Sequence, residues 1–300
     1  MKHRGIKVLT EHQNTPILRE MTQNLERAKR VAQIELNPPA RTRVITISNQ
    51  KGGVGKTTTA VNLAAALARK GMQVLVIDLD PQGNASTALG VEHHSGVISS
   101  YEVMMGEATM AEAVKPSTEH ENLVCLPATI DLAGAEIDLV AREGRERILA
   151  NALSVYSASR ANRLDYVFID SPPSLGLLTV NALTAATEVL VPIQCEYYAL
   201  EGVTQLVSNI ERIKSALNPA LVVSSILLTM FDNRTNLSAD VSAEVKKYFP
   251  SQTLSTVIPR SVRLSEAPSF GQTAISYDPK NSGSLAYQEA AIELAQQGAH

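Results

Sequence analysis

The chain has few of the residues that build disulfide frameworks, metal clusters or fibrous repeats. Only two cysteines, Cys125 and Cys195, occur in 300 residues, and no Cys-x-x-Cys pair is present. One chain can therefore build neither a disulfide framework nor a four-thiolate metal site. The counts of 16 Gly and 14 Pro are too low for a collagenous or low-complexity protein. These absences favour a folded chain in a reducing cytosol.

Long uncharged apolar runs are also missing. The longest stretches without a charge, residues 171–187 and 215–231, contain Pro, Ser, Thr or Asn. They fall short of the roughly 20 apolar residues that span a bilayer. The chain opens Met-Lys-His-Arg, but no apolar segment of the kind found in a secretory signal follows. We therefore expect a cytoplasmic protein without a transmembrane helix.

The charge is distributed unevenly along the chain. A content of 44% hydrophobic and 19% charged residues is typical of a soluble globular protein, and the net charge is −3. Residues 1–43 hold nine Lys or Arg against four Glu and so carry +5, which leaves −8 on the remainder. A basic arm on an acidic body suggests a polyanionic partner, although a charged arm can also be merely solvated.

The arm, residues 1–43, is predicted to contain one helix. Thr15 can cap this helix, and Pro16 suits the first helical position. Apolar residues recur behind them at helical spacing, at Ile17, Met21, Leu25, Ala28 and Ala32. Pro38 and Pro39 are expected to end the helix.

From residue 43 onward, short β-branched runs alternate with helical segments. The predicted strands are 44–48, 73–77, 123–126, 166–169, 189–193, 222–228 and 256–258. The predicted helices are 56–69, 145–156, 176–186, 200–216, 239–248 and 285–296. This alternation predicts an α/β fold in which a mostly parallel sheet has helices on both faces. No glycine-rich linker divides residues 44–300, which we interpret as one domain.

A glycine-rich loop between the first predicted strand and helix is the strongest functional signal. Residues 49–58 read Asn-Gln-Lys-Gly-Gly-Val-Gly-Lys-Thr-Thr. Glycines let the backbone approach phosphate oxygens, and a helix N-terminus adds partial positive charge. Lys56 is then expected on the β- and γ-phosphates, and the Thr57 hydroxyl on Mg²⁺. The predicted nucleotide contacts are Lys51, Gly53, Val54, Gly55, Lys56, Thr57 and Thr58.

The loop departs from the common P-loop, which has glycine where this chain has Gln50. In this form it resembles the deviant Walker A box of the ParA/MinD family of P-loop ATPases. The resemblance implies a three-layer P-loop NTPase fold. It also implies that Lys51 reaches the nucleotide of a second subunit, with Gly52 giving room at the dimer interface. ATP would then lie sandwiched between two facing chains.

Two aspartates at predicted strand ends support the site. Asp80, in Asp-Leu-Asp-Pro-Gln-Gly, matches the switch I residue of the family that positions the attacking water. Asp170, in Phe-Ile-Asp-Ser-Pro-Pro, resembles the Walker B residue that is oriented toward the metal. No side chain resembles a strong general base, so Lys51, Lys56 and Asp80 are the catalytic candidates and we predict slow, partner-stimulated hydrolysis.

Two further segments, residues 228–236 and 257–269, make the body similar to the ParA/Soj chromosome-partitioning ATPases. By this resemblance Pro259 and Ser261 flank the adenine. It also implies an ATP- and Mg²⁺-dependent homodimer that binds double-stranded DNA nonspecifically and is nucleoid-associated. A ParB-type centromere-binding protein would stimulate ATP hydrolysis and release the dimer. The role could be in chromosome or plasmid segregation.

A nucleic-acid surface on this acidic body must be a local patch, because phosphate contacts come from Lys and Arg. The candidates are Arg234, Lys246, Lys247, Arg260 and Arg263. Each could instead be an ordinary solvated charge, and Arg260 could serve the nucleotide.

The main alternative is a MinD-like ATPase that positions itself on a membrane surface, or one that positions another cargo. A membrane-binding member would need a basic amphipathic C-terminal helix, whereas residues 286–297 carry Glu289 and Glu293 and no Lys or Arg. Paired cysteines of a cluster carrier are not indicated, since Cys125 and Cys195 fall at ordinary strand positions. The extra substrate loop of the metabolic P-loop synthases is not recognisable. We therefore predict no membrane partner.

Overall fold

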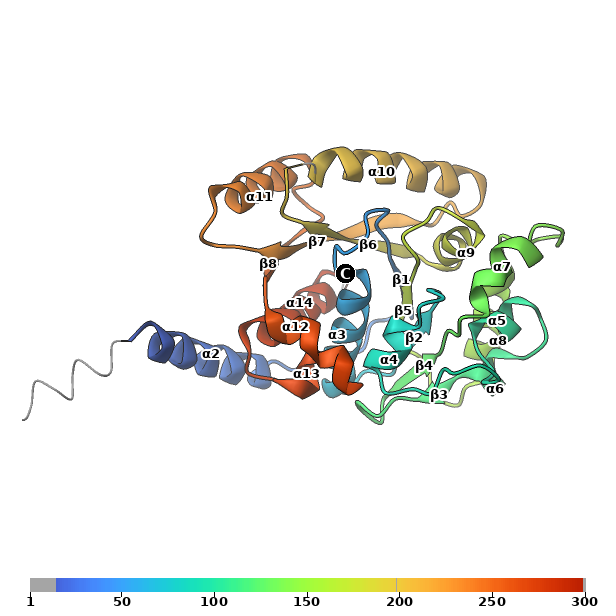
Figure 1. The fold of residues 1–300 in the computed structure, drawn as a ribbon, viewed down its shortest axis with the longest axis horizontal. Helices are drawn as coiled ribbons and strands as arrows, with labels where there is room; N and C mark the ends of the chain where they lie inside the picture. Colours follow the sequence, from blue (N-terminus) through green and yellow to red (C-terminus); the bar gives the residue numbers. More distant parts are fainter. Residues whose placement is uncertain (1–14, 198, 299–300) are drawn as a thin grey trace, which may run out of the picture.

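The computed structural model of the chain describes residues 15–197 and 199–298, and the side chains of residues 16, 17 and 199–201 lie outside that description. Within these bounds the body is one α/β unit built on a single sheet. The sheet is mostly parallel and carries helices on both faces (Figure 1). The predicted three-layer fold is confirmed.

The described sheet has eight strands in the order β3-β4-β2-β5-β1-β6-β7-β8. Their bounds are β1 (Arg43–Ile47), β2 (Val74–Asp78), β3 (Lys115–Pro116), β4 (Leu123–Leu126), β5 (Tyr166–Asp170), β6 (Glu188–Gln194), β7 (Val222–Phe231) and β8 (Thr253–Pro259). All neighbours are parallel except β3, which pairs antiparallel with β4. The central strands are almost wholly buried, as is usual for a sheet covered on both faces.

The strand order brings three loops to one edge of the sheet. The chain passes from β1 to β2 on one side and places β6 on the other, so β1 lies at a topological switch point. In open α/β sheets, ligands bind beyond the carboxyl ends of the strands at such a point. The register pairs Asp170 of β5 with both Ile47 of β1 and Asp78 of β2. The loops after β1, β2 and β5 therefore meet there.

Helices bury the two faces of the sheet separately. On one face α3 (Lys56–Arg69) and α14 (Ser282–Gln297) pack against alternate strand residues such as Ile45 and Phe168. The other face is covered by α8 (Ile148–Ser159), α9 (Leu177–Ala185), α10 (Ala199–Ala216) and α11 (Asn236–Tyr248). The shorter helices are α4 (Asn84–Ala88), α5 (Ser100–Met104), α6 (Met110–Ala113), α7 (Leu132–Asp138), α12 (Val262–Glu266), the 3₁₀ helix η2 (Ala267–Phe270) and α13 (Ala274–Tyr277).

All predicted strands and long helices of the body are present, with ends that differ by up to three residues. β3 and the short helices have no counterpart among the predicted elements, because segments of two to seven residues carry too little hydrophobic periodicity to be recognised. Both cysteines are buried, Cys125 within β4. Cys195 is predicted at a strand position, but it lies directly after the end of β6.

The helix predicted in the basic arm is α2 (Pro16–Gln33). Its N-terminus has the predicted form, since the Thr15 hydroxyl accepts a 3.4 Å hydrogen bond from the Leu18 N–H and Pro16 stands at the start. The helix ends five residues before Pro38. It ends there because the Lys70 ammonium donates hydrogen bonds to carbonyl oxygens at the end of the helix, those of Val31 and Ile34.

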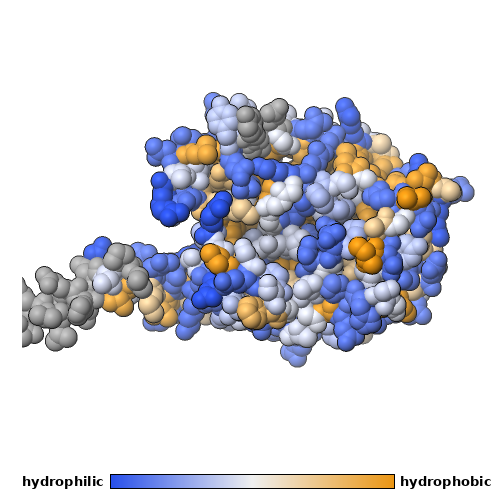
Figure 2. All heavy atoms as spheres, in the orientation of Figure 1, coloured by the Kyte–Doolittle hydropathy of each residue, from blue (hydrophilic) through white to orange (hydrophobic). Residues whose placement is uncertain are grey.

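The C-terminal half of α2 is held to the body. There the Arg27 guanidinium makes a bidentate ion pair with Glu289 of α14, at 2.9 and 2.7 Å. The other half projects beyond the body (Figures 1 and 2), and Leu18 and Met21 leave an apolar flank on it exposed, which continues to Leu25 in the C-terminal half. The charges at residues 2–11 and the side chain of residue 17 lie outside the described residues. The division between arm and ATPase domain at residue 43 stays a prediction.

Candidate nucleotide-binding site

The loop between β1 and α3 has a backbone that can approach an anion closely. Gly53 and Gly55 adopt left-handed conformations, with φ of 74° and 89°, that other residues rarely adopt. Gly55 is the N-cap of α3 and brings no side chain to the first N–H groups of the helix. Thr229 of β7 fixes the loop by donating a 2.9 Å hydrogen bond to the Val54 carbonyl. This geometry supports a phosphate site, in which the roles of residues 53–58 stay predictions.

Lys56 lies inside this loop. It is 8% exposed, and its ammonium is 3.4 Å from the carbonyl oxygen of Lys51. Burial lowers the pKa of Lys56, while the charges of Asp170 and Asp80 act in the opposite direction. A phosphate anion placed against the ammonium would stabilise its charged form. Lys56 is thus positioned as a phosphate-binding residue.

Asp170 ends β5 with both carboxylate oxygens buried and, among the described residues, without a hydrogen-bond partner. Burial raises the pKa of Asp170 well above its ordinary value and the charge of Asp78 raises it further, whereas the Thr57 hydroxyl and Lys56 lower it. Buried oxygens without partners are costly. A carboxylate and a hydroxyl are the hard oxygen donors that Mg²⁺ prefers.

Thr57 and Asp170 therefore fit a magnesium ion. In the part of the chain that the structure describes, no group of three His, Cys, Asp or Glu side chains could hold a metal ion. An ion at this site would therefore take most of its ligands from phosphate oxygens and water, which is the usual pattern for Mg²⁺ bound with a nucleotide.

Asp78 is a further residue of the site that the sequence analysis leaves without a role. It is fully buried, and its carboxylate accepts hydrogen bonds from the Ser86 N–H (2.9 Å) and hydroxyl (2.7 Å) and from the Asp80 N–H (3.1 Å). Burial raises the pKa of Asp78 to about 6, against the effect of these bonds. Asp78 thus holds the loop that carries Asp80. Its position at the end of a predicted strand, two residues before Asp80, is the signal that could have identified it.

Asp80 is half-buried beside the phosphate loop. One carboxylate oxygen accepts a 3.0 Å hydrogen bond from the Gln82 N–H, which fixes the side chain. Its charge raises the pKa of Lys56 and also contributes to the raised pKa of Asp170. Asp80 therefore lies close enough to Lys56 and Asp170 for their charges to interact. The predicted alignment of a water by Asp80 is possible in this position.

Lys51 lies at the surface, unlike the buried Lys56. Its side chain is 49% exposed and forms an ion pair with Glu196, which follows the end of β6. The backbone is pinned as well, because the Lys51 N–H donates a 3.0 Å hydrogen bond to the Asn49 side chain. Gly52 is also exposed. The Lys51 side chain thus lies at the surface and the Lys56 side chain inside the loop. The sequence could have indicated Glu196 as a partner, because it is an acidic residue close to the end of a predicted strand.

A cavity of about 240 Å³ adjoins the loop where the adenine is predicted. Pro259 and Ser261 line it together with Thr58 and Met230. The Ser261 hydroxyl is 2.9 Å from the Asn281 side-chain oxygen, so it is engaged outside the cavity. Met230, with φ of 51°, is the one non-glycine residue with a positive φ in the described chain. Such strain is concentrated at functional sites, and this observation supports a ligand here.

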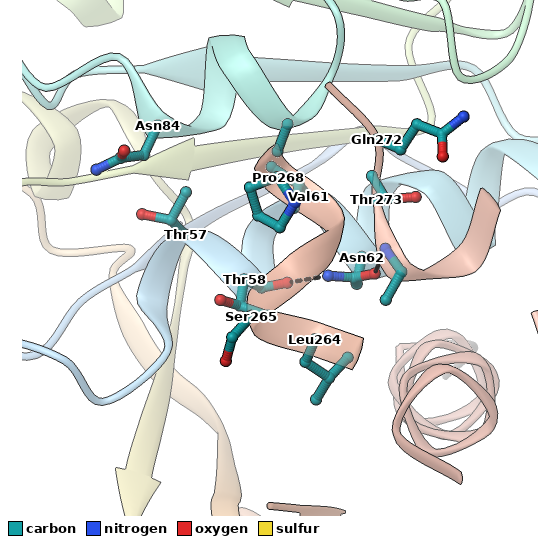
Figure 3. Close-up of a pocket in the computed structure, with 12 residues that line it drawn as sticks. Thr57, Thr58, Val61, Asn62, Asn84, Leu264, Ser265, Pro268, Gln272 and Thr273 are labelled. Carbon is teal, nitrogen blue, oxygen red and sulfur yellow. Dashed lines mark hydrogen bonds between the residues drawn. The ribbon is translucent and has the colours of Figure 1, made fainter. Parts of the chain in front are cut away.

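A second cavity, also of about 240 Å³, lies on the other side of Thr58. Figure 3 shows it between α3, α4 and the segment from α12 to α13, with Thr57 and Asn84 at one end. The Asn62 side chain donates a 2.8 Å hydrogen bond to the Thr58 carbonyl and so supports the first turn of α3 (Figure 3). Thr57, which is predicted to bind Mg²⁺, is one of the residues that line this cavity.

Of the three arginines predicted to bind DNA, Arg234 and Arg260 lie on the loops that follow β7 and β8, and Arg263 lies on α12. The Arg260 N–H donates a 3.1 Å hydrogen bond to the carbonyl of Phe231 at the end of β7, which brings the two loops together. Arg234 has a side chain that is 85% exposed and pairs with Asp232 at 2.9 and 2.7 Å. Arg263 pairs with Glu266 at 2.9 Å. Both arginines are therefore neutralised locally.

The two lysines predicted with them lie elsewhere. Lys246 and Lys247 are exposed in the last turn of α11. At 1.5 Å per residue they are roughly 15 Å along the helix from the end that Arg234 precedes. The predicted patch is thus one arginine group and a separate lysine pair.

Comparison with known proteins gives consistent matches. A sequence model of a family described as an AAA domain matches residues 42–223. The sporulation initiation inhibitor protein Soj of Bacillus subtilis is 50% identical over 256 residues, which are 85% of this chain and 99% of that protein. The chromosome partitioning protein ParA of Caulobacter vibrioides is 51% identical over 253 residues, which are 84% and 93% of the two chains.

Solved structures share the fold. A cobyrinic acid a,c-diamide synthase from Mycobacterium smegmatis with bound ADP and magnesium has a TM-score of 0.72 and 40% identity, covering 84% of this chain and 93% of that chain. The cell division ATPase MinD from Pyrococcus furiosus has a TM-score of 0.69 and 25% identity, covering 85% and 98%.

Proposed function

The chain belongs to the ParA/Soj family of chromosome-partitioning ATPases, and we propose that it segregates a chromosome or plasmid by an ATP-dependent cycle of DNA binding and release. As a member of this family it is a P-loop ATP hydrolase that uses ATP and Mg²⁺. In the proposed cycle ATP closes a sandwich homodimer, the dimer binds double-stranded DNA nonspecifically on the nucleoid, and a ParB-type protein stimulates hydrolysis and releases it.

The contrast between the two lysines of the loop is the observation that carries this proposal. Lys56 is enclosed beside Asp170 and Asp80, as a lysine that binds its own nucleotide must be. Lys51 is half-exposed and lies next to the bare backbone of Gly52. A side chain in that position can reach the nucleotide of a facing subunit.

The residues of the site suit slow hydrolysis. Lys56 would bind the β- and γ-phosphates, and the partner subunit's Lys51 would add positive charge where negative charge develops. Asp80 would orient the attacking water, since its carboxylate is fixed by Gln82. Mg²⁺ held near Thr57 and Asp170 would neutralise charge on the phosphate oxygens. Because no strong general base is present in this set, turnover would depend on a partner.

DNA binding is proposed for the arginine group. Arg234 and Arg260 lie on adjoining loops at the nucleotide-binding edge of the sheet, and Arg263 lies on α12, which follows the second loop, so a dimer would place two such groups together. Phosphate oxygens would have to replace Asp232 and Glu266 as partners of two of these side chains. Such contacts give sequence-independent affinity that weakens with salt.

The MinD-like alternative is less well supported. α14 at the C-terminus packs into the core through residues such as Leu285, Tyr287 and Leu294 and has no Lys or Arg. In the described part of the chain, no helix is long and apolar enough to cross a membrane. The synthase alternative rests on a solved structure at 40% identity, whereas the partition proteins are about 50% identical.

Co-sedimentation tests the proposal. The chain is mixed with plasmid DNA or with anionic liposomes, each in Mg²⁺ with ATP or with ADP. We expect sedimentation with DNA in ATP and not in ADP, and none with liposomes. Binding to liposomes but not to DNA would overturn the assignment.

A further inference from the structure

The first turn of α9 has no capping side chain of its own. Its N-cap is Gly176, and no acidic residue stands in its first turn. The first N–H groups of a helix have no partner within that helix and need one from outside. Residues 171–176 form the whole connection between Asp170 and α9. Whatever satisfies these N–H groups therefore also fixes one end of the loop that begins at Asp170.

Glu136 of α7 supplies the missing cap, and α7 lies beside α9 (Figure 1). One carboxylate oxygen of Glu136 accepts a 2.8 Å hydrogen bond from the Leu177 N–H. The other oxygen accepts a 3.3 Å hydrogen bond from the Leu178 N–H. The partial positive charge at the N-terminus of a helix favours a carboxylate there. Glu136 thus caps α9 from a different helix.

The close approach of Glu136 depends on Gly176. The φ of Gly176 is −90°, which any residue adopts, so glycine is needed here for space and not for backbone conformation. A Cβ atom on Gly176 would lie 2.1 Å from one Glu136 oxygen and 2.5 Å from the other. A side chain at this position would therefore displace the carboxylate from the end of α9.

The loop of residues 171–176 is also tied to the strand beside it. The Ser171 hydroxyl donates a 2.9 Å hydrogen bond to the carbonyl of Ile47, the last residue of β1. Within the loop, the Ser174 carbonyl accepts a 2.6 Å hydrogen bond from the Thr179 hydroxyl of α9. The loop is thus held by β1 at its start and by α9 at its end, so the position of α9 bears on the residues next to Asp170.

We propose that Glu136 is a positioning residue for ATP hydrolysis, which holds α9 so that the loop keeps Asp170 directed at the magnesium site. Among the described residues neither Asp170 oxygen has a hydrogen-bond partner, so the backbone on either side must set its direction. Loss of Glu136 then slows hydrolysis and leaves the affinity for ATP unchanged, because the phosphate loop is untouched. This inference rests on the site proposed for Mg²⁺ and not on the cycle of DNA binding.

Steady-state ATP turnover of the full chain in Mg²⁺ tests this role. Glu136→Ala is expected to lower kcat on the order of tenfold, since a small misplacement in a site has a large effect on rate. KM should stay within about twofold of the parent value. A loss of ATP affinity with an unchanged kcat would overturn the proposal.

Glu293→Ala is the matched control. The Glu293 carboxylate also accepts hydrogen bonds from two consecutive backbone N–H groups, those of Ser255 (2.5 Å) and Thr256 (2.9 Å). These belong to β8, at the edge of the sheet and four strands from β5 in the strand order. The control removes the same kind of contact there and should keep the parent kcat. An equal loss of kcat in both variants would make the role of Glu136 merely structural and overturn the proposal.

Gly176→Ala tests whether the effect passes through this contact. In the parent chain the new Cβ would displace the Glu136 carboxylate, so kcat should fall about as far as in Glu136→Ala. In the Glu136→Ala chain no carboxylate is left to displace, and adding Gly176→Ala should change kcat by less than about twofold. Two losses that multiply would show independent effects and would overturn the proposal.

The position of the loop can also be measured without turnover. The chain contains no Trp, and Leu175 of the loop is 44% exposed, so Leu175→Trp provides a single fluorescent reporter. In the nucleotide-free reporter chain, Glu136→Ala should shift the emission maximum and change quenching by acrylamide, whereas Glu293→Ala should change neither. Identical emission and quenching in all three chains would overturn the proposal. Turnover that survives Lys56→Ala would instead show that the proposed nucleotide site is wrong.

Discussion

The Lys51 ammonium is paired with the Glu196 carboxylate of the same chain. Both side chains are nearly half-exposed, at 49% and 44%, so the pair forms at the surface and not inside the nucleotide pocket. If Lys51 is to reach the nucleotide of a second subunit, it must first leave Glu196. In the proposed dimer the pair would therefore oppose association by a small amount.

Glu196→Gln is expected to make the ATP-dependent dimer form at lower protein concentration. An exposed ion pair contributes about 0.2–1 kcal/mol and a symmetric dimer would break two of them, so the shift should be at most about thirtyfold. Sedimentation velocity in Mg²⁺-ATP over a range of protein concentrations measures it. Glu211→Gln removes the partner of Lys214 in another exposed pair and serves as the control. A weaker dimer in Glu196→Gln would show that Glu196 supports the interface instead.

Lys56→Ala is expected to weaken ATP binding by roughly 100-fold, since a charge-assisted contact to phosphate is lost. Folding should survive, because burial already disfavours the Lys56 ammonium in the nucleotide-free chain. Titration with a fluorescent ATP analogue, together with a thermal unfolding curve, gives both quantities. Unchanged affinity would show that the loop is not the phosphate site.

Arg263→Glu is expected to lower DNA affinity by about tenfold and to reduce the salt dependence of binding, while the ATP-dependent dimer persists. Lys246→Glu makes the same change of charge at the far end of α11, and we expect a smaller loss there. Fluorescence anisotropy with a labelled duplex at several salt concentrations separates the two. Equal DNA affinity for the parent and Arg263→Glu would reject the arginine group.

The pH dependence of the free energy of unfolding should reveal the raised pKa of Asp78. Because its pKa in the folded chain is raised to about 6, the protonated form is favoured on folding, and this contribution is present at low pH. It is lost as the pH rises from about 4 through about 6, at about 1.4 kcal/mol per unit of pKa difference. Urea unfolding of the nucleotide-free chain at pH 4.5 and 7.5 should therefore show a smaller loss with rising pH in Asp78→Asn than in the parent. The same difference in both would contradict the assignment.

The sequence predicts most of the fold, because long periodic segments carry their own signal. α3 has its predicted bounds, since a glycine precedes it and apolar residues recur along its 14 residues. The glycine-rich loop and Asp170 are likewise found at strand ends that the sequence identifies. α7 could not be predicted, because its seven residues are too few for a periodic pattern.

The contacts made across the fold could not be predicted. Glu196 is 145 residues from Lys51, and Glu136 is 41 residues from Leu177. Lys51 meets Glu196 because the parallel strands bring distant loops to one edge of the sheet. Glu136 meets Leu177 because α7 and α9 are neighbouring helices on one face of the sheet. The separation of Lys246 from Arg234 has the same origin, since α11 runs away from the edge where Arg234 lies.

The proposed action of Lys51 on the nucleotide of a second subunit is tested most directly by the mass of the chain in saturating Mg²⁺-ATP. Asp80→Ala is used as the background, because it should block hydrolysis and leave ATP binding intact. We predict a particle of twice the single-chain mass of 32.3 kDa for Asp80→Ala. We predict a monomer that still binds ATP when Lys51→Ala is added. The same mass for both variants would contradict the account.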